Sequence, residues 1–307
     1  MIERRGSYRC MTPSPDLTPD AEVLTLESLS NRTGYNEQFL GPAVPLPRPT
    51  DPGIETVVLP YTHFSVVFRP DRRLAASTAV MIDGQKLIEV DRTNDWRFDP
   101  RVPDAQQAGD PVYKNNPLDK GHLVRRLDPV WGTGSETTAA NSDTFHYTNA
   151  APQMDVFNQG KQLWQGLEDF LLNHAKNFHR KLSVFTGPVL EDTDPPYRGV
   201  KVPLRFWKVA AFMQDGELAA TAYVLDQSPD LSHEVAARAM ADAAQAGDPP
   251  PLGAFRTFQV PVADVAEITG LDLGPLPGAD RLPSHMLAAR QWTRLEGFED
   301  IAVGTRD

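Results

Sequence analysis

The chain has 307 residues, of which 40% are hydrophobic and 23% charged, and its formal net charge is -11. This composition is that of a globular protein able to bury a sizeable core, and no run approaches the roughly 18 apolar residues of a membrane span. The acidic balance excludes a globally basic nucleic-acid binder, so any binding of phosphate must depend on a local patch.

The single cysteine, Cys10, excludes an intramolecular disulfide and a cysteine-based zinc site. The first residues carry charges, but no apolar segment follows them, so no secretory signal peptide is visible. We therefore expect a cytoplasmic protein, or one exported without a cleaved signal peptide, and no membrane partner.

Three segments are expected along the chain. Residues 1–56 contain eight prolines, which rule out long regular elements, and form an arm that is partly ordered or packed on the main domain. Residues 57–283 form a single domain, and residues 284–307 form a C-terminal tail.

The main domain begins with segments of β character. Val57–Leu59 and Phe64–Phe68 are predicted strands, and Thr78–Val90 is predicted to form a hairpin around the turn dipeptide Asp83-Gly84. A second hairpin is predicted for 204–225, around Asp215-Gly216. These hairpins indicate a largely antiparallel sheet.

Helices are expected later in the chain. Apolar residues recur at three- and four-residue spacing in 158–178, which predicts a helix with one buried face. An Ala-rich helix is expected over 232–245, and a last helix over 262–269 that ends at Gly270, a residue suited to a left-handed cap.

The pentapeptide Leu118–His122 carries the clearest chemistry. Cleavage of a phosphodiester needs a base for the attacking water, positive charge for the phosphate and help for the leaving oxygen. His122 titrates near neutral pH and can take the proton, while Lys120 can meet a phosphate oxygen. Gly121 between them removes side-chain bulk where a phosphate and the backbone must approach.

A magnesium ion could supply the third function, because it keeps most of its water and often takes one or two protein ligands. Asn158 stands at the expected start of a helix, where its carbonyl suits that role. Taken alone, Asn158 also suits a helix N-cap, Lys120 a solvated surface charge, and a single histidine a structural role.

The combination of motifs is more specific than any member. The motifs, in chain order, are Leu118–Leu123, Thr144–Gln153, Phe157–Gly160, Trp164–Glu168, Phe185–Pro188, Phe206–Val209 and Gln259–Val262. Together they resemble the DNA/RNA non-specific endonuclease family over about Tyr61 to Gly270.

The resemblance implies an α+β protein with the ββα-metal (His-Me finger) nuclease fold, a largely antiparallel central sheet flanked by helices. It implies a hydrolase that cuts DNA and RNA with one Mg²⁺, which Mn²⁺ can replace. By motif, His122 would be the general base and Asn158 the direct metal ligand. Glu168 would act on the metal through a water, and Asn149 would stand in the adjacent wall of the site, with a structural or water-orienting role.

Several positions depart from the family pattern or leave it open. Lys120 stands where the family usually has arginine. Lysine keeps the positive charge but cannot form the bidentate hydrogen bonds of a guanidinium with phosphate. The step from Asn158 to Glu168 is two residues longer than expected. Either Arg92 or Arg97 could be the further arginine of the site.

Arg125 and Arg126 are expected to bind the substrate. Residues 86–128 contain eight basic and eight acidic residues, so any basic groove must be made by folding. A catalytically weak nucleic-acid or protein-binding module and a phosphodiesterase of small nucleotides are the alternative functions. A protein inhibitor, a regulatory partner and a homodimer stay open.

Overall fold

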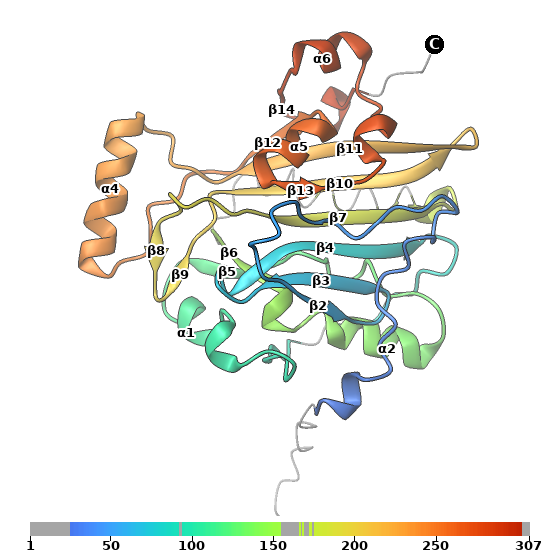
Figure 1. The fold of residues 1–307 in the computed structure, drawn as a ribbon, viewed down its shortest axis with the longest axis horizontal. Helices are drawn as coiled ribbons and strands as arrows, with labels where there is room; N and C mark the ends of the chain where they lie inside the picture. Colours follow the sequence, from blue (N-terminus) through green and yellow to red (C-terminus); the bar gives the residue numbers. More distant parts are fainter. Residues whose placement is uncertain are drawn as a thin grey trace, which may run out of the picture.

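The computed structural model describes residues 25–91, 94–154, 166, 168, 172–173 and 175–302. An antiparallel eight-stranded sheet forms the centre of this part, in the order β14-β12-β11-β10-β7-β4-β3-β2 (Figure 1). Its strands are β2 (Val57–Pro60), β3 (Phe64–Arg69), β4 (Leu74–Asp83), β7 (Lys181–Val189), β10 (Arg205–Gln214), β11 (Glu217–Asp226), β12 (Arg256–Val260) and β14 (Thr293–Leu295).

Short strand pairs and helices surround this sheet. The pairs are β1 (Arg48–Pro49) with β13 (Leu271–Asp272), β5 (Leu118–His122) with β6 (Ala150–Met154), and β8 (Pro196–Tyr197) with β9 (Val200–Lys201). The helices are α1 (Asp110–Tyr113), α2 (Gly134–Asp143), α4 (His233–Ala246), α5 (Val262–Thr269) and α6 (Ser284–Ala289). The expected α+β class with a largely antiparallel sheet is confirmed.

Both faces of the sheet are covered. Every residue of β4 is buried, and its side chains divide between two apolar clusters. One cluster contains Leu74 and Ile82 together with Leu118 and Ala151 of the β5–β6 pair, and the other contains Ala79 with Val265 of α5. Because alternate residues of a strand point to opposite faces, β4 connects the two layers of core. The β5–β6 pair is thereby fixed on one face of the sheet.

The hairpin predicted for 204–225 is confirmed, because β10 and β11 pair along their whole length and Asp215 and Gly216 both have positive φ, 52° and 84°. The hairpin predicted for Thr78–Val90 is wrong. Both edges of β4 are already paired, with β3 and β7, so no edge is left for the residues after Asp83. Ile88 instead donates its N–H to the carbonyl of Val130 at 3.1 Å.

The expected helices over 232–245 and 262–269 are present as α4 and α5, and Gly270 caps α5 with φ 64°. Much of the helix expected over 158–178 lies outside the described residues. Within it, Gly166, Glu168, Leu172, Asn173 and residues 175–177 are helical.

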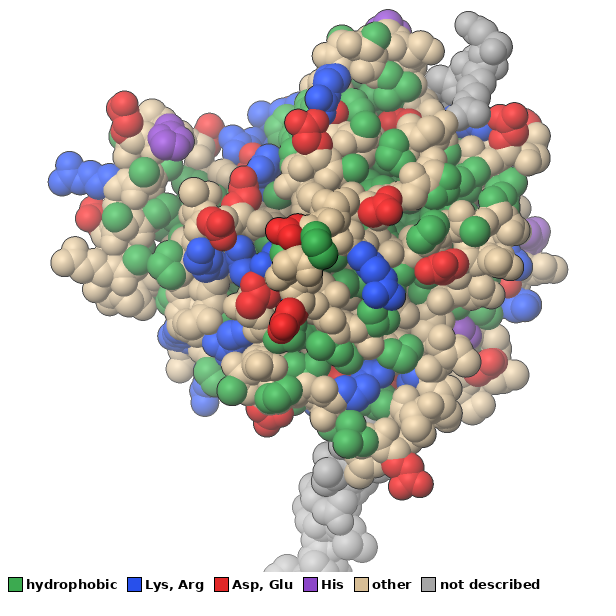
Figure 2. Space-filling view, viewed as in Figure 1, with side chains coloured by type: hydrophobic (Ala, Val, Ile, Leu, Met, Phe, Trp, Pro, Cys, Tyr) green, Lys and Arg blue, Asp and Glu red, His purple; other side chains and the backbone are tan. Residues whose placement is uncertain are grey.

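The described part of the N-terminal arm packs on the domain. Val44 is fully buried in the cluster that holds α5, β1 pairs with β13, and Arg32 forms an ion pair with Asp143 at 2.7 Å. Within the described residues, no helix is both long enough and apolar enough to traverse a lipid bilayer. On the face drawn in Figure 2, acidic and basic side chains are interspersed among the described residues.

Candidate active site

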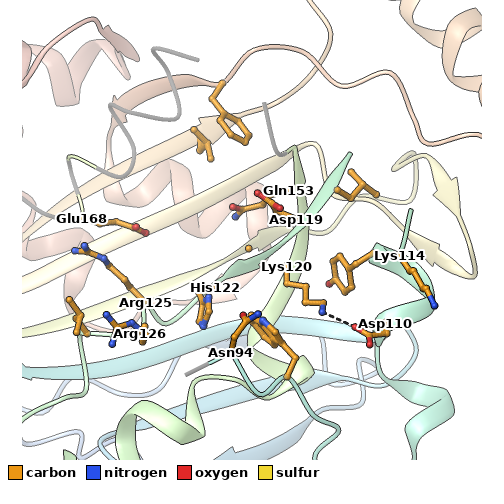
Figure 3. Close-up of a pocket in the computed structure, with 17 residues that line it drawn as sticks. Asn94, Asp110, Lys114, Asp119, Lys120, His122, Arg125, Arg126, Gln153 and Glu168 are labelled. Carbon is orange, nitrogen blue, oxygen red and sulfur yellow. Dashed lines mark ion pairs between the residues drawn. The ribbon is translucent and has the colours of Figure 1, made fainter. Parts of the chain in front are cut away.

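The pentapeptide forms β5, and its register with β6 sets the direction of its side chains. Lys120 lies opposite Pro152 and His122 opposite Ala150. Alternate residues of a strand share a face, so Leu118, Lys120 and His122 point the same way. All three line one cleft of about 920 Å³ (Figure 3).

The cleft is polar and nearly balanced in charge. Its charged lining among the described residues comprises Lys114, Lys120, Arg125, Arg126, Asp110, Asp119 and Glu168. Four cationic side chains and three carboxylates thus line the cleft; in Figure 3, Arg125, Arg126 and Glu168 lie on one side of His122, and Lys120 and Asp110 on the other. Folding turns a neutral stretch of sequence into a site where one unit of positive charge remains in excess.

His122 is held by aromatic packing and by a fixed backbone. Its ring lies 4.6 Å from that of Trp96, tilted by 51°, and 5.0 Å from that of Phe145, at 88°. The next residue, Leu123, donates its N–H to the carbonyl of Asn149 at 3.0 Å. The imidazole therefore has a defined place on the wall of the cleft, as a general base requires.

Lys120 lies beside two aromatic rings that stack on each other, and next to a carboxylate. Its Nζ is 5.8 Å from the ring centre of Trp96, 5.6 Å from that of Tyr147 and 2.7 Å from Asp110 Oδ1. The Tyr147 hydroxyl donates to the same Oδ1 at 2.6 Å. Hydrogen bonds from Lys120 and Tyr147 hold the pKa of Asp110 below its usual value. The Asp110 carboxylate is therefore ionised at neutral pH.

Glu168 reaches the same cleft from the helical segment that follows β6. The strands β5 and β6 and these helical residues give the ββα arrangement that the resemblance implies. Glu168 Oε1 lies 3.1 Å from Nζ of Lys208, a β10 side chain that is only 1% exposed. Lys208 also donates to Thr186 Oγ1 at 3.2 Å. A buried cation thus fixes one carboxylate oxygen of Glu168 at the edge of the cleft.

Asn149 is fully buried, and its amide bonds three main-chain groups. Its Oδ1 accepts from the N–H of Val124 at 2.9 Å, and its Nδ2 donates to the carbonyls of Val124 and Thr144, both at 3.0 Å. Both N–H groups of the amide are therefore engaged with backbone. Of the structural and water-orienting roles expected for Asn149, this geometry favours the structural one.

Of the two candidates for the further arginine of the site, Arg97 is described in the structure and Arg92 is not. Arg97 is not among the described residues that line the cleft, and its Nη2 donates to the carbonyl of Ser142 at 2.5 Å, at the end of α2. Arg92 lies outside the described residues. Arg92 therefore stays a prediction, whereas the guanidinium of Arg97 is directed to α2.

Arg125 and Arg126 line the cleft, and their binding of substrate stays a prediction. They also line a neighbouring cavity of about 250 Å³ on their other side. Arg126 Nη1 donates to the carbonyl of Val90 at 3.0 Å and to Asn141 Oδ1 at 3.3 Å, so this side chain also connects the loop at Val90 to α2.

Three side chains that contact the expected site residues were not singled out from the sequence. Lys208 had a signal, because a charged residue in the apolar run 206–212 is unusual for a buried strand. Tyr147 belongs to a recognised motif, but its contact with Asp110 could not be read from it. Asp110 had no sequence signal, since its importance comes from a contact made by folding.

The donors present suit a hard cation better than zinc, because they are carboxylate and amide oxygens, here Glu168, Asp119 and Gln153. Within the described part of the chain, no three His, Cys, Asp or Glu side chains gather into a group that could hold a metal. Asn158, the expected direct ligand, lies outside that part.

The model of the DNA/RNA non-specific endonuclease family matches residues 46–278, and every described residue that lines the cleft falls inside this range. Similar proteins include uncharacterized protein y4fB of Sinorhizobium fredii (strain NBRC 101917 / NGR234), 39% identical over 260 residues, which cover 78% of this chain and 38% of that protein. Human mitochondrial endonuclease G is 27% identical over 151 residues, which cover 45% of this chain and 48% of that protein.

A crystal structure of the EndoG/EndoGI complex is 19% identical with a TM-score of 0.49, and the match covers 70% of this chain and 84% of that one. The chain spans less than half of the length of the curated relatives it matches. The family model, in contrast, matches most of this chain. The chain therefore belongs to the DNA/RNA non-specific endonuclease family.

Proposed function

We propose that the chain is a metal-dependent, sugar-nonspecific endonuclease that hydrolyses phosphodiester bonds in DNA and RNA. Family membership supports the class of reaction. The observation that carries the proposal is the convergence of His122, Lys120 and Glu168 on one polar cleft. A base, a cation and a carboxylate at one site are what hydrolysis of a phosphodiester needs.

In this mechanism His122 accepts a proton from the attacking water. Packing against Trp96 and Phe145 keeps its ring in one orientation, so little reorganisation is needed when the substrate binds. Lys120 and Arg125 stabilise the negative charge that develops on the phosphate. Arg126 binds the neighbouring backbone at the rim.

A magnesium-type ion, when bound, supplies positive charge to the phosphate and to the leaving oxygen. Asn158 would be its direct ligand, and Glu168 would hold it through water. The ion pair with Lys208 supports this role, because it orients the carboxylate, which stays 12% exposed at the cleft.

The test is cleavage of plasmid DNA, single-stranded DNA and RNA with Mg²⁺ or Mn²⁺. His122→Ala should lower the rate by about 10²- to 10⁴-fold, the usual contribution of a general base. His285→Ala is the matched control, since His285 is exposed on α6 and is not a cleft residue. Undiminished cleavage by His122→Ala would remove the base from the proposal.

The alternative functions give different results in the same assay. A binding module would shift DNA in a gel without cutting it in magnesium. A phosphodiesterase of small nucleotides would cut a chromogenic diester and leave long DNA intact.

A further inference from the structure

The cleft contains a carboxylate at a place where a nuclease needs positive charge. Asp110 Oδ1 lies 2.7 Å from Nζ of Lys120, the ion pair marked in Figure 3. The Tyr147 hydroxyl donates to the same oxygen at 2.6 Å. One anionic oxygen thus receives two donors on the wall of the cleft. A non-bridging oxygen of a phosphodiester would seek the same two donors.

We propose that Asp110 is an internal substitute for the substrate phosphate, and that nucleic acid must displace it from Lys120 in order to bind. The inference rests on the proposed function, because it assigns Lys120 to the phosphate backbone. In this inference, Asp110 lowers the affinity of the cleft for nucleic acid.

A purely positioning role for Asp110 is less consistent with the contacts. Lys120 already lies beside the stacked rings of Trp96 and Tyr147, and its strand β5 is paired with β6. The Asp110 side chain is 66% exposed, and ion pairs with so exposed a partner contribute little to the stability of the fold. Removing the carboxylate charge should therefore leave the ammonium in place.

Charge strengthens the argument. The described lining has four cationic side chains and three carboxylates, so neutralising Asp110 doubles the excess of positive charge from one to two. The Lys120 ammonium has three N–H donors, so it could contact both Asp110 and a phosphate. However, it attracts a second anion less strongly while the Asp110 carboxylate is next to it. The lowered pKa of Asp110 means that this competition persists at neutral pH.

The experiment measures binding without cleavage. The His122→Ala protein is titrated, in EDTA, into a fluorescent DNA duplex, with and without Asp110→Asn. Asparagine keeps an acceptor for the Tyr147 hydroxyl and removes the charge. Asp104→Asn is the matched control, since Asp104 is exposed in the segment before α1 and is not a cleft residue.

Asp110→Asn should lower the Kd by about three- to tenfold, and the control should change it by less than about twofold. The slope of log Kd against log salt should steepen by about one ion, because one more cation is available to phosphate. In a Lys120→Met background the gain should disappear, since the two groups would act as one unit.

Each other outcome overturns the inference. Weaker binding of Asp110→Asn would mean that the carboxylate positions Lys120 for the substrate. Equal gains for Asp110→Asn and Asp104→Asn would mean that only net charge matters, and a gain that survives in Lys120→Met would exclude Lys120 as the group released. Failure of the proposed function is distinguishable, because the unsubstituted protein would then leave DNA uncut in magnesium, whatever the Kd values of the variants.

Discussion

The three hydrogen bonds of Asn149 to the main chain give a stability prediction that can be worked out from the contacts. Asn149→Ala removes the partners of the Val124 N–H, the Val124 carbonyl and the Thr144 carbonyl. Val124 and Thr144 are both at most 1% exposed, so water does not reach these groups without rearrangement. A buried polar group left without a partner costs about 1–3 kcal/mol.

Three such groups give an expected loss of about 3–9 kcal/mol in the free energy of unfolding, a large part of the roughly 5–15 kcal/mol of a typical domain. Asn149→Asp should cost at least as much. It keeps the acceptor for the Val124 N–H but turns the two donated bonds into contacts between oxygens. Because aspartate has the same shape as asparagine, a loss of stability in Asn149→Asp would come from the hydrogen bonds and not from packing.

The assay is urea unfolding followed by far-UV circular dichroism, with Asn173→Ala as an exposed helical control that should change stability by less than about 0.5 kcal/mol. Cleavage should also fall under conditions where the Asn149 variants are folded, because Val124 is two residues from His122. A loss of stability below about 1 kcal/mol for both variants would refute the reasoning, since the three bonds would then be replaceable by water.

Three further predictions concern the site and the core around it. Lys120→Arg should raise the cleavage rate if bidentate hydrogen bonds to phosphate fit the site. An unchanged rate would mean that other residues bind the phosphate. Lys208→Met should lower cleavage and weaken Mn²⁺ binding measured by calorimetry, because Glu168 loses its buried partner; an unchanged metal titration would exclude this route. Burial lowers the pKa of His146 to about 4, so the folded state binds fewer protons than the unfolded state between about pH 6.5 and 4. Stability should therefore fall over this range as the pH is lowered, by about 2 kcal/mol between pH 7 and 5 from this residue, and urea titrations of His146→Gln should lack that component; an identical slope would exclude His146 as its source.

Two identical dipeptides explain which parts of the fold could be predicted from the sequence. Asp215-Gly216 closes the predicted hairpin, because the strands on its two sides, β10 and β11, pair with each other. Their other edges pair with β7 and β12. Asp83-Gly84 has the same local signal, but β4 already has a partner on each side. Gly84 is instead packed against the backbone of the later helical segment, where an added Cβ would lie 1.9 Å from the carbonyl oxygen of Ala175. Turn chemistry is local, whereas strand neighbours are decided by the whole sheet.

The same distinction separates predictable from unpredictable parts of the site. His122 and Lys120 are two residues apart on one strand, so their common direction follows from strand geometry. The partners of Lys120 and Glu168 lie on other elements, Asp110 before β5 and Lys208 on β10. Chain separation hides these contacts from pattern analysis, and the roles of Asn158 and Arg92 stay predictions because both lie outside the described residues.

The acidic net charge and the nuclease site are compatible because they act over different distances. In physiological salt, charges more than about 8 Å apart are largely screened, so the overall charge of -11 weakly affects a phosphate already in the cleft. What that phosphate meets is the local set of cations, in which Lys120 is paired with Asp110, while the carboxylate of Glu168 is held by the buried Lys208. The affinity of the site is thus set by which carboxylate each cation holds, and Asp110, more exposed than Glu168, is the one that substrate can replace.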